Sequence, residues 1–143
     1  MMKKQFFTHT NEEMWNVARE TTRSFRDCNV VLLRGELGAG KTTFAQGILK
    51  AFGAEEPFTS PTFVIMKKYD IKHEKFENVY HFDCYRVNSY DIEDLGWKEI
   101  ISNKKNCVLV EWPEKIWDII PEKYCLIDLS IIDKDKRKID VNL

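Results

Sequence analysis

The chain has 143 residues, enough to bury one core but too few for a nucleotide site plus a separate substrate domain, so we expect a single domain over residues 1–143. Its 22 Lys and Arg side chains face 23 Asp and Glu, a net charge of -1 that argues against free-standing nucleic-acid binding. The apolar runs are too short to span a membrane, and four scattered cysteines without a C-x-x-C pair indicate reduced thiols. We therefore expect a cytoplasmic protein with no membrane association.

The first expected elements are an edge strand and an amphipathic helix. Residues Lys4–Phe7 fit a short strand. Apolar residues then recur at helical spacing from Met14 to Phe25. Thr8, Thr10 or Asn11 could cap that helix, because each carries a side-chain oxygen that accepts a hydrogen bond from the first turn.

A glycine-rich segment follows the apolar run Val30–Leu33, which is typical of a buried strand. Residues Gly35–Thr43 fit the spacing G-x-x-x-x-G-K-[ST] of a phosphate-binding loop. Glycines let the backbone wrap an anion with its N–H groups, Lys41 would neutralise the outer phosphates, and the Thr42 hydroxyl would reach Mg²⁺. Residues Thr43–Phe52 repeat apolar side chains on one helical face, and the positive end of that helix would point at the phosphates.

The middle of the chain predicts a hairpin and a broken helix. A linker over Glu55–Thr62 precedes two β-rich runs, Phe63–Tyr69 and Asn78–Tyr85. Their connection is too short for a crossover helix, so this pair should be antiparallel. Residues Tyr90–Ser102 should be helical with a break near Gly96.

The last third of the chain completes the predicted sheet. The continuous apolar run Cys107–Val110 is typical of a central parallel strand. A helical turn over Pro113–Pro121 then precedes a strand pair, Cys125–Ile132 and Lys138–Val141, joined by a solvated turn. The expected fold is α/β, a P-loop NTPase-like three-layer sandwich with a mixed parallel and antiparallel sheet.

Two carboxylates are candidates for a magnesium site, because a hard dication beside phosphates needs further oxygen ligands. Glu111 ends the predicted central strand, at the usual position of an acidic metal residue, and Asp83 ends the run Val79–Phe82. If both strands neighbour the loop strand, the two carboxylates could converge on one ion. The alternative is a helix N-cap or a surface charge, which the nearby Pro113 makes plausible for Glu111.

Other side chains near these motifs have two or three interpretations each. Residues Thr59–Thr62 have the composition of a loop that senses a terminal phosphate, or of a simple turn. The strand alternation around His81 favours packing over catalysis. Arg86 could meet a phosphate or pair with Glu93 or Asp94. Trp112 could cover the site, bind a partner or pack at the edge of the core.

The nucleotide is predicted from a missing motif. Ras-type GTPases read guanine with an N-K-x-D loop, whereas Asn103-Lys104-Lys105-Asn106 lacks the acidic residue. Without that carboxylate the guanine-selective hydrogen bonds cannot form. ATP is therefore the expected ligand.

Four ordered motifs resemble those of the TsaE family, the small bacterial ATPases of tRNA threonylcarbamoyladenosine biosynthesis. They are Gly35–Thr43, Ser60–Phe63, His81–Arg86 and Glu111–Glu114. The resemblance implies ATP binding and slow hydrolysis in a cytoplasmic complex with TsaD and TsaB, where the chain regulates or resets the transferase and meets tRNA only indirectly. The segment Asn88–Gly96 departs from the family pattern by lacking its usual proline.

The resemblance also implies roles for individual residues. Lys41 would contact phosphates, Thr42 and Glu111 would hold Mg²⁺, and Asp83 would assist the metal or the attacking water. The turn before the first helix would lie near the adenine. The full predicted set is Lys41, Asp83 and Glu111 for catalysis; Asn11 (with Thr10 as its alternative), Gly35, Gly38, Ala39, Gly40, Lys41, Thr42 and Thr43 for the nucleotide; and Thr42, Asp83 and Glu111 for the metal.

Two other functions fit the loop. A small-molecule kinase would also transfer phosphate from ATP, but such kinases usually close an Arg-rich lid, and the six arginines of this chain form no cluster after the loop helix. A nucleotide sensor without hydrolysis is the third possibility.

Overall fold

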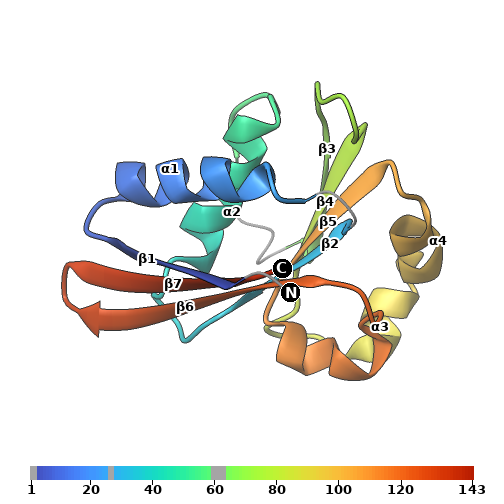
Figure 1. Ribbon diagram of the computed structural model, residues 1–143. Helices are drawn as coiled ribbons and strands as arrows, with labels where there is room; N and C mark the ends of the chain where they lie inside the picture. Colours follow the sequence, from blue (N-terminus) through green and yellow to red (C-terminus); the bar gives the residue numbers. More distant parts are fainter. Residues whose placement is uncertain (1–2, 26–27, 59–63) are drawn as a thin grey trace.

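The computed structural model describes residues 3–25, 28–58 and 64–143, which form a seven-stranded sheet with helices on both faces (Figure 1). Across the sheet the strands are β1 (Lys3–Thr8), β7 (Lys136–Asn142), β6 (Cys125–Asp133), β2 (Val30–Arg34), β5 (Asn106–Glu111), β4 (Asn78–Asp83) and β3 (Met66–Asp70). Strands β6, β2, β5 and β4 run parallel to one another, while β7 pairs antiparallel with β1 and β6, and β3 pairs antiparallel with β4. The predicted mixed sheet is confirmed, and so is the antiparallel hairpin.

The central strands are buried on both faces, as their continuous apolar runs predicted. In β2, Val31 and Leu33 pack toward helices α1 (Asn11–Thr22) and α2 (Lys41–Ala51), while Val30 and Leu32 pack toward the opposite layer. All residues of β5 are buried as well. A strand covered on both faces needs apolar side chains at every position, which explains the absence of alternation.

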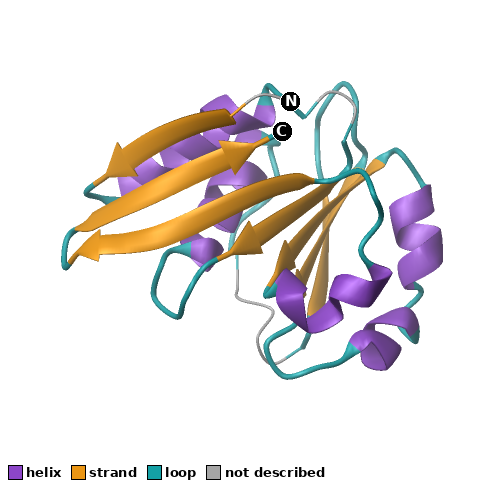
Figure 2. Cartoon of the chain, turned by 60° about the horizontal axis from the view of Figure 1, so that its bottom comes forward, coloured by secondary structure: helices purple, strands orange, loops and turns teal. Residues whose placement is uncertain are grey.

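The second helical layer consists of short helices. It contains α3 (Ser89–Glu93), α4 (Trp97–Ser102) and the 3-10 helix η2 (Pro113–Ile119), on the face away from α1 and α2 (Figure 2). Gly96 separates α3 from α4, as the predicted helix break required. The three-layer arrangement is confirmed.

Helix α1 begins where a side-chain oxygen can cap it. Of the three candidates, Thr10 is the N-cap: its Oγ1 accepts a hydrogen bond of 3.0 Å from the backbone N–H of Glu13. The helix then buries Met14 and Ala18 against the core, which fixes its orientation over the sheet.

Helices α1 and α2 touch at a glycine. A Cβ atom on Gly47 would lie 2.7 Å from the Cβ of Ala18 and 3.0 Å from the Cα of Trp15. These distances are shorter than carbon atoms tolerate, so only glycine allows this approach of the two helices. The contact holds α1 beside the helix that follows the glycine-rich loop.

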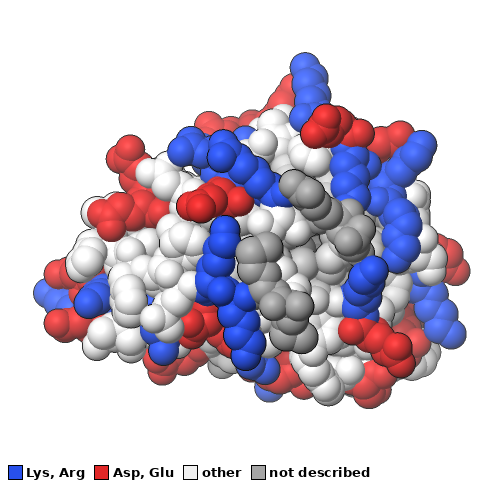
Figure 3. Space-filling view, in the orientation of Figure 1, with Lys and Arg blue, Asp and Glu red and all other residues white. Residues whose placement is uncertain are grey.

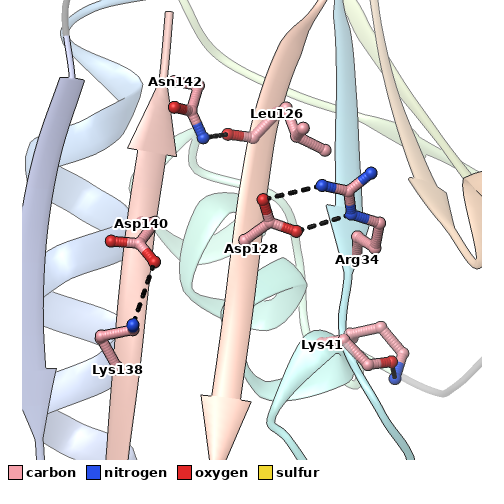
Figure 4. Close-up of polar contacts among 8 residues, drawn as sticks. Arg34, Lys41, Leu126, Asp128, Lys138, Asp140 and Asn142 are labelled. Atoms are coloured by element: carbon pink, nitrogen blue, oxygen red, sulfur yellow. Dashed lines mark hydrogen bonds and ion pairs between the residues drawn. The ribbon is translucent and has the colours of Figure 1, made fainter.

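The antiparallel side of the sheet exposes a polar face. In the described part of the chain, no helix covers the face of β6 and β7 that points away from α1 and α2 (Figure 2). Arg34 donates two hydrogen bonds to Asp128, from Nε at 2.7 Å and from the terminal nitrogen at 3.0 Å (Figure 4). This pairing raises the pKa of Arg34. Lys138 and Asp140 form a second ion pair at 3.7 Å. Among the residues that the structure describes, charged pairs, rather than a covering helix, therefore occupy this face of the sheet.

Composition-based expectations agree with the structure where they can be compared. All four cysteines are buried and free, as reduced thiols would be. Acidic and basic side chains interleave on the surface shown in Figure 3, in keeping with the net charge of -1. Within the described ranges, none of the helices has the length and apolar character that crossing a membrane requires.

Candidate nucleotide-binding site

The glycine-rich loop connects β2 to α2 at the carboxyl end of the central strands. Gly40 is the N-cap residue of α2, with a φ of 106° that side-chain-bearing residues rarely adopt. A Cβ atom there would also meet the Met14 side chain at 2.8 Å. Glycine at this position therefore lets the chain turn into α2 with the first backbone N–H groups of the helix free to meet an anion.

The Lys41 side chain folds over the loop. Its Nζ donates hydrogen bonds to the carbonyl oxygens of Gly35 at 2.6 Å and Glu36 at 3.0 Å. The ammonium group also lies 4.0 Å from the centroid of the Trp112 ring. Burial lowers the pKa of Lys41, while the negative charge of Glu111 opposes that shift. The structure thus holds the buried positive charge of Lys41 against the backbone of the loop.

Trp112 covers this charge from the end of β5. Its backbone is left-handed, with a φ of 60°, an uncommon conformation for a bulky residue that costs about 1–3 kcal/mol. The Trp112 ring packs against Tyr85, with ring centroids 4.8 Å apart. Of the three roles considered for Trp112, the structure supports two: the ring lies over Lys41, and it also packs at the edge of the core.

Glu111 connects two elements through its carboxylate. Oε1 accepts a hydrogen bond of 3.0 Å from Thr42 Oγ1 at the start of α2, and Oε2 lies 2.6 Å from His81 Nε2 on β4. Glu111 and His81 are each only 2% exposed. The N-cap position of η2 belongs to Trp112 and has no side-chain hydrogen bond, so Glu111 is neither a helix cap nor a surface charge.

Asp83 lies beside Glu111, but its strand is not a neighbour of the loop strand, although the prediction from sequence supposed that it would be. Strand β4 is not a neighbour of the loop strand β2, because β5 lies between them. Asp83 is instead the register partner of Glu111 across β4 and β5. Its Oδ1 accepts a hydrogen bond of 3.0 Å from the backbone N–H of Tyr85. The two carboxylates therefore end adjacent strands at the same edge of the sheet.

Two cavities flank the loop. The carboxylate cavity has a volume of about 540 Å³ and contains Lys41, Thr42, Asp83 and Glu111. The N-terminal cavity, of about 250 Å³, lies on the other side of the loop and includes Asn11. The remaining predicted residues distribute as follows: Gly38, Gly40 and Thr43 line both cavities, Thr10 lines the N-terminal cavity, and Gly35 and Ala39 belong to the loop itself.

Comparison with known proteins identifies the family. A sequence model described as "Threonylcarbamoyl adenosine biosynthesis protein TsaE" matches residues 8–139. The chain belongs to the TsaE family. It is 36% identical to the tRNA threonylcarbamoyladenosine biosynthesis protein TsaE of Rickettsia bellii, over 96% of this chain and 93% of that protein. It is 34% identical to the corresponding Bacillus subtilis protein, over 97% of this chain and 85% of that one.

A solved structure supports both the family and the fold. The crystal structure of Bacillus subtilis YdiB superimposes with a TM-score of 0.73 and 28% identity, covering 98% of this chain and 84% of that one. The α/β sandwich predicted from the sequence is thus the fold of a solved relative. Membership of the TsaE family ties the chain to tRNA threonylcarbamoyladenosine biosynthesis.

The fold also brings to the site two residues that the sequence did not mark. His81 was predicted to serve packing, yet its Nε2 contacts Glu111. Its position two residues before Asp83, on the same face of β4, was the available signal. Arg137 lines the N-terminal cavity and donates from Nε to the carbonyl of Gly38 at 3.3 Å. No motif marks Arg137, because its approach to the loop depends on how β7 pairs.

Two other expectations concern Arg86 and the segment Thr59–Thr62. Arg86 is exposed and lines the carboxylate cavity. Among the described residues it forms no ion pair with Glu93 or Asp94. The hydroxyl-rich segment Thr59–Thr62 lies outside the described residues, so its role as a phosphate sensor stays a prediction.

The oxygen-rich chemistry of the carboxylate cavity suits magnesium rather than a soft metal. Thr42, Glu111 and Asp83 contribute only oxygen atoms. Within residues 3–25, 28–58 and 64–143 there is no group of three or more His, Cys, Asp or Glu that could hold a metal alone. The donor set therefore fits an ion that takes most of its ligands from phosphates and water, as Mg²⁺ does.

Proposed function

We propose that the chain binds ATP with Mg²⁺ and hydrolyses it slowly, with residues 1–143 acting as one P-loop ATPase domain. The observation that carries this proposal is the hydrogen bond between Thr42 and Glu111, formed beside Lys41 in one cavity. A hydroxyl on the loop helix and a carboxylate at the end of the neighbouring strand are the partners a magnesium–phosphate complex needs.

Phosphate binding follows from the start of α2. The helix has 11 residues, and its first N–H groups have no partner within the helix, so its positive end attracts an anion. Lys41 adds a full positive charge. On nucleotide binding, its hydrogen bonds to the carbonyls of Gly35 and Glu36 would be replaced, at least in part, by hydrogen bonds to phosphate oxygens. A triphosphate along the loop would place its outer groups in the carboxylate cavity.

The metal is expected between Thr42 and the two carboxylates. Thr42 and Glu111 would hold Mg²⁺, and Asp83 would assist through a water molecule or orient the attacking water. Bound Mg²⁺ supplies positive charge that stabilises the charge developing on the transferred phosphoryl group. Lys41 supplies a second positive charge, and Trp112 shields both from solvent.

The base is proposed to bind in the N-terminal cavity. Thr10 and Asn11 line it together with Gly40 and Thr43, so a nucleotide whose phosphates lie on the loop can reach it directly. Arg137 also lines this cavity and ties the β6–β7 turn to the loop. ATP is preferred over GTP because the chain lacks the acidic residue of the guanine-reading N-K-x-D loop.

The biological setting is proposed from the family. As a TsaE-family member the chain would act with TsaD and TsaB in the cytoplasm, as a regulator or resetting factor of the transferase, with tRNA contacted only indirectly. The net charge of -1 supports an indirect rather than a direct contact with tRNA. Mixing the chain with TsaD, TsaB and ATP at micromolar concentration should produce comigration in size-exclusion chromatography, and separate elution would contradict the complex.

Titration calorimetry with ATP tests the central proposal. ATP should bind with Mg²⁺ and more weakly in EDTA, and no heat of binding in either condition would refute the assignment. A phosphate-release assay then distinguishes hydrolysis from the alternative, a small-molecule kinase. Release to water without added metabolites supports the ATPase, whereas transfer that requires a metabolite supports the kinase. If the chain binds ATP but does not hydrolyse it, even with TsaD and TsaB present, the result would support a nucleotide sensor without hydrolysis.

A further inference from the structure

We propose that His81 is a positioning residue that holds the Glu111 carboxylate in the orientation needed for Mg²⁺. The inference rests on the proposed function, because it assigns a supporting partner to the proposed metal site. It starts from the 2.6 Å contact between His81 Nε2 and Glu111 Oε2, which joins two adjacent strands beneath the start of α2.

The Glu111 carboxylate is fixed at both oxygens. Thr42 binds Oε1 from α2, and His81 binds Oε2 from β4, so rotation of the carboxylate breaks at least one hydrogen bond. Water cannot readily replace the bond to His81, because both residues are 2% exposed. The remaining lone pairs of Glu111 are therefore held in constant directions relative to the carboxylate cavity.

The unpaired ring nitrogen of His81 favours a positioning role over a packing role. Nδ1 is buried and has no hydrogen-bond partner within the described residues. An apolar ring would fill the same space without burying an unpaired polar atom, which costs about 1–3 kcal/mol. What histidine adds is the donor at Nε2. In the proposed role His81 is the donor, so its ring carries a proton on Nε2.

Supporting hydrogen bonds of this kind affect metal affinity more than nucleotide affinity. In metal sites, removing the residue that hydrogen-bonds a metal ligand typically lowers the metal affinity by about 10–100-fold. His81 lies behind Glu111 and is absent from the residues that line the carboxylate cavity. Its loss should therefore leave metal-free nucleotide binding intact.

Two variants test separately the hydrogen-bond donor and the aromatic ring of His81. His81→Phe keeps an aromatic ring and removes the donor, whereas His81→Gln removes the ring and keeps an N–H donor. Calorimetry would measure ATP affinity in EDTA and across a Mg²⁺ titration. We expect unchanged affinity in EDTA for both variants, a roughly tenfold loss of Mg²⁺ affinity in His81→Phe, and a smaller loss in His81→Gln.

Two results would overturn the inference while wild-type protein still binds ATP with Mg²⁺. One is a Mg²⁺ titration of His81→Phe that overlays the wild type. The other is an equal loss of ATP affinity with and without Mg²⁺, which would indicate a general structural defect. If wild-type protein does not bind ATP, the proposed function fails instead, so the two failures are distinguishable.

A measurement on the wild-type chain keeps the inference testable if the variants do not fold. The protein has three histidines, and His9 and His73 are exposed. NMR on isotope-labelled histidine should show one imidazole N–H that exchanges slowly with solvent, located on Nε2 of His81. Substitution of His9 and His73 would assign the signals. A proton on Nδ1 of His81, with Nε2 bare, would refute the proposed donation from His81 to Glu111.

Discussion

Thr42 Oγ1 donates a hydrogen bond of 3.0 Å to Glu111 Oε1, although 69 positions separate the two residues in the chain. The bond joins the start of α2 to the end of β5, so the phosphate-binding loop and the strand edge share one cavity. Neither residue alone is specific for a metal site. Their contact makes the two motifs parts of one site.

Glu111→Gln should remove most of the Mg²⁺ dependence of ATP binding while the fold is kept. The substitution preserves the size of the side chain but deletes the negative charge that the metal requires. We expect Mg²⁺ affinity to fall by at least about tenfold, because the Glu111 carboxylate is hydrogen-bonded to Thr42 at the start of the loop helix. The fall should exceed that in Asp83→Asn, because Asp83 is proposed to assist the metal only through water. Calorimetric titrations check this, with circular dichroism as the folding control. If Asp83→Asn has the larger effect, Asp83 is the metal ligand.

Lys41→Ala should weaken ATP binding both with and without Mg²⁺. Its ammonium is the buried charge of the loop, and hydrogen bonds to charged groups are worth about 1.5–3 kcal/mol, or roughly 10–150-fold in affinity. Lys50→Ala is the matched control, because Lys50 is an exposed lysine of the same helix that packs over Trp15, away from the loop. Equal ATP affinity of the Lys41 variant and the wild type would rule out the loop as the phosphate site.

Arg86→Ala should reduce the rate of ATP hydrolysis more than ATP affinity. Arg86 is an exposed cation on the wall of the carboxylate cavity, where it can meet charge that develops on the outer phosphate. Arginines in such positions contribute large factors to turnover, and we expect a loss of at least roughly tenfold here. Phosphate release with saturating ATP measures the effect, and Arg23→Ala, on an exposed residue that lines neither cavity, is the control. Unchanged turnover would place Arg86 outside the reaction.

The order of elements was predictable because each one leaves a local pattern. The buried strand at Val30–Leu33, the loop at Gly35–Thr43 and the break at Gly96 all follow from periodicity or glycine placement, and the structure agrees with each. The pairing of Asp83 with Glu111 was less predictable. It required knowing that β5 separates β4 from β2, which no local pattern contains.

The residues that were missed depend on contacts between distant segments. His81 has the alternation of an ordinary packed strand, and only the position of Glu111 on the adjacent strand turns it into a hydrogen-bond donor. Arg137 reaches the carbonyl of Gly38 from 99 residues further along the chain. Such contacts are set by sheet order and register, so a sequence without structure predicts the loop but not the residues that support it.

Gly47→Ala should destabilise the protein although alanine is the better helix former. Alanine gains about 1 kcal/mol of helix propensity over glycine. Against this gain, its Cβ would lie 2.7 Å from the Cβ of Ala18 and 3.0 Å from the backbone of Trp15, and overpacking of a core typically costs about 1–3 kcal/mol. Because the nearer contacts are a short side chain and backbone, α1 must move as a unit.

We therefore expect a net loss of up to about 2 kcal/mol in the free energy of unfolding and a melting temperature lower by up to roughly 6 °C. Gln46→Ala, at the half-exposed neighbouring position of α2, is the control and should change stability little. Displacement of α1 would also move Asn11 in the N-terminal cavity, so ATP affinity should fall in the Gly47 variant alone. A Gly47→Ala protein more stable than the wild type would show that separating the two helices costs less than the roughly 1 kcal/mol gained in helix propensity.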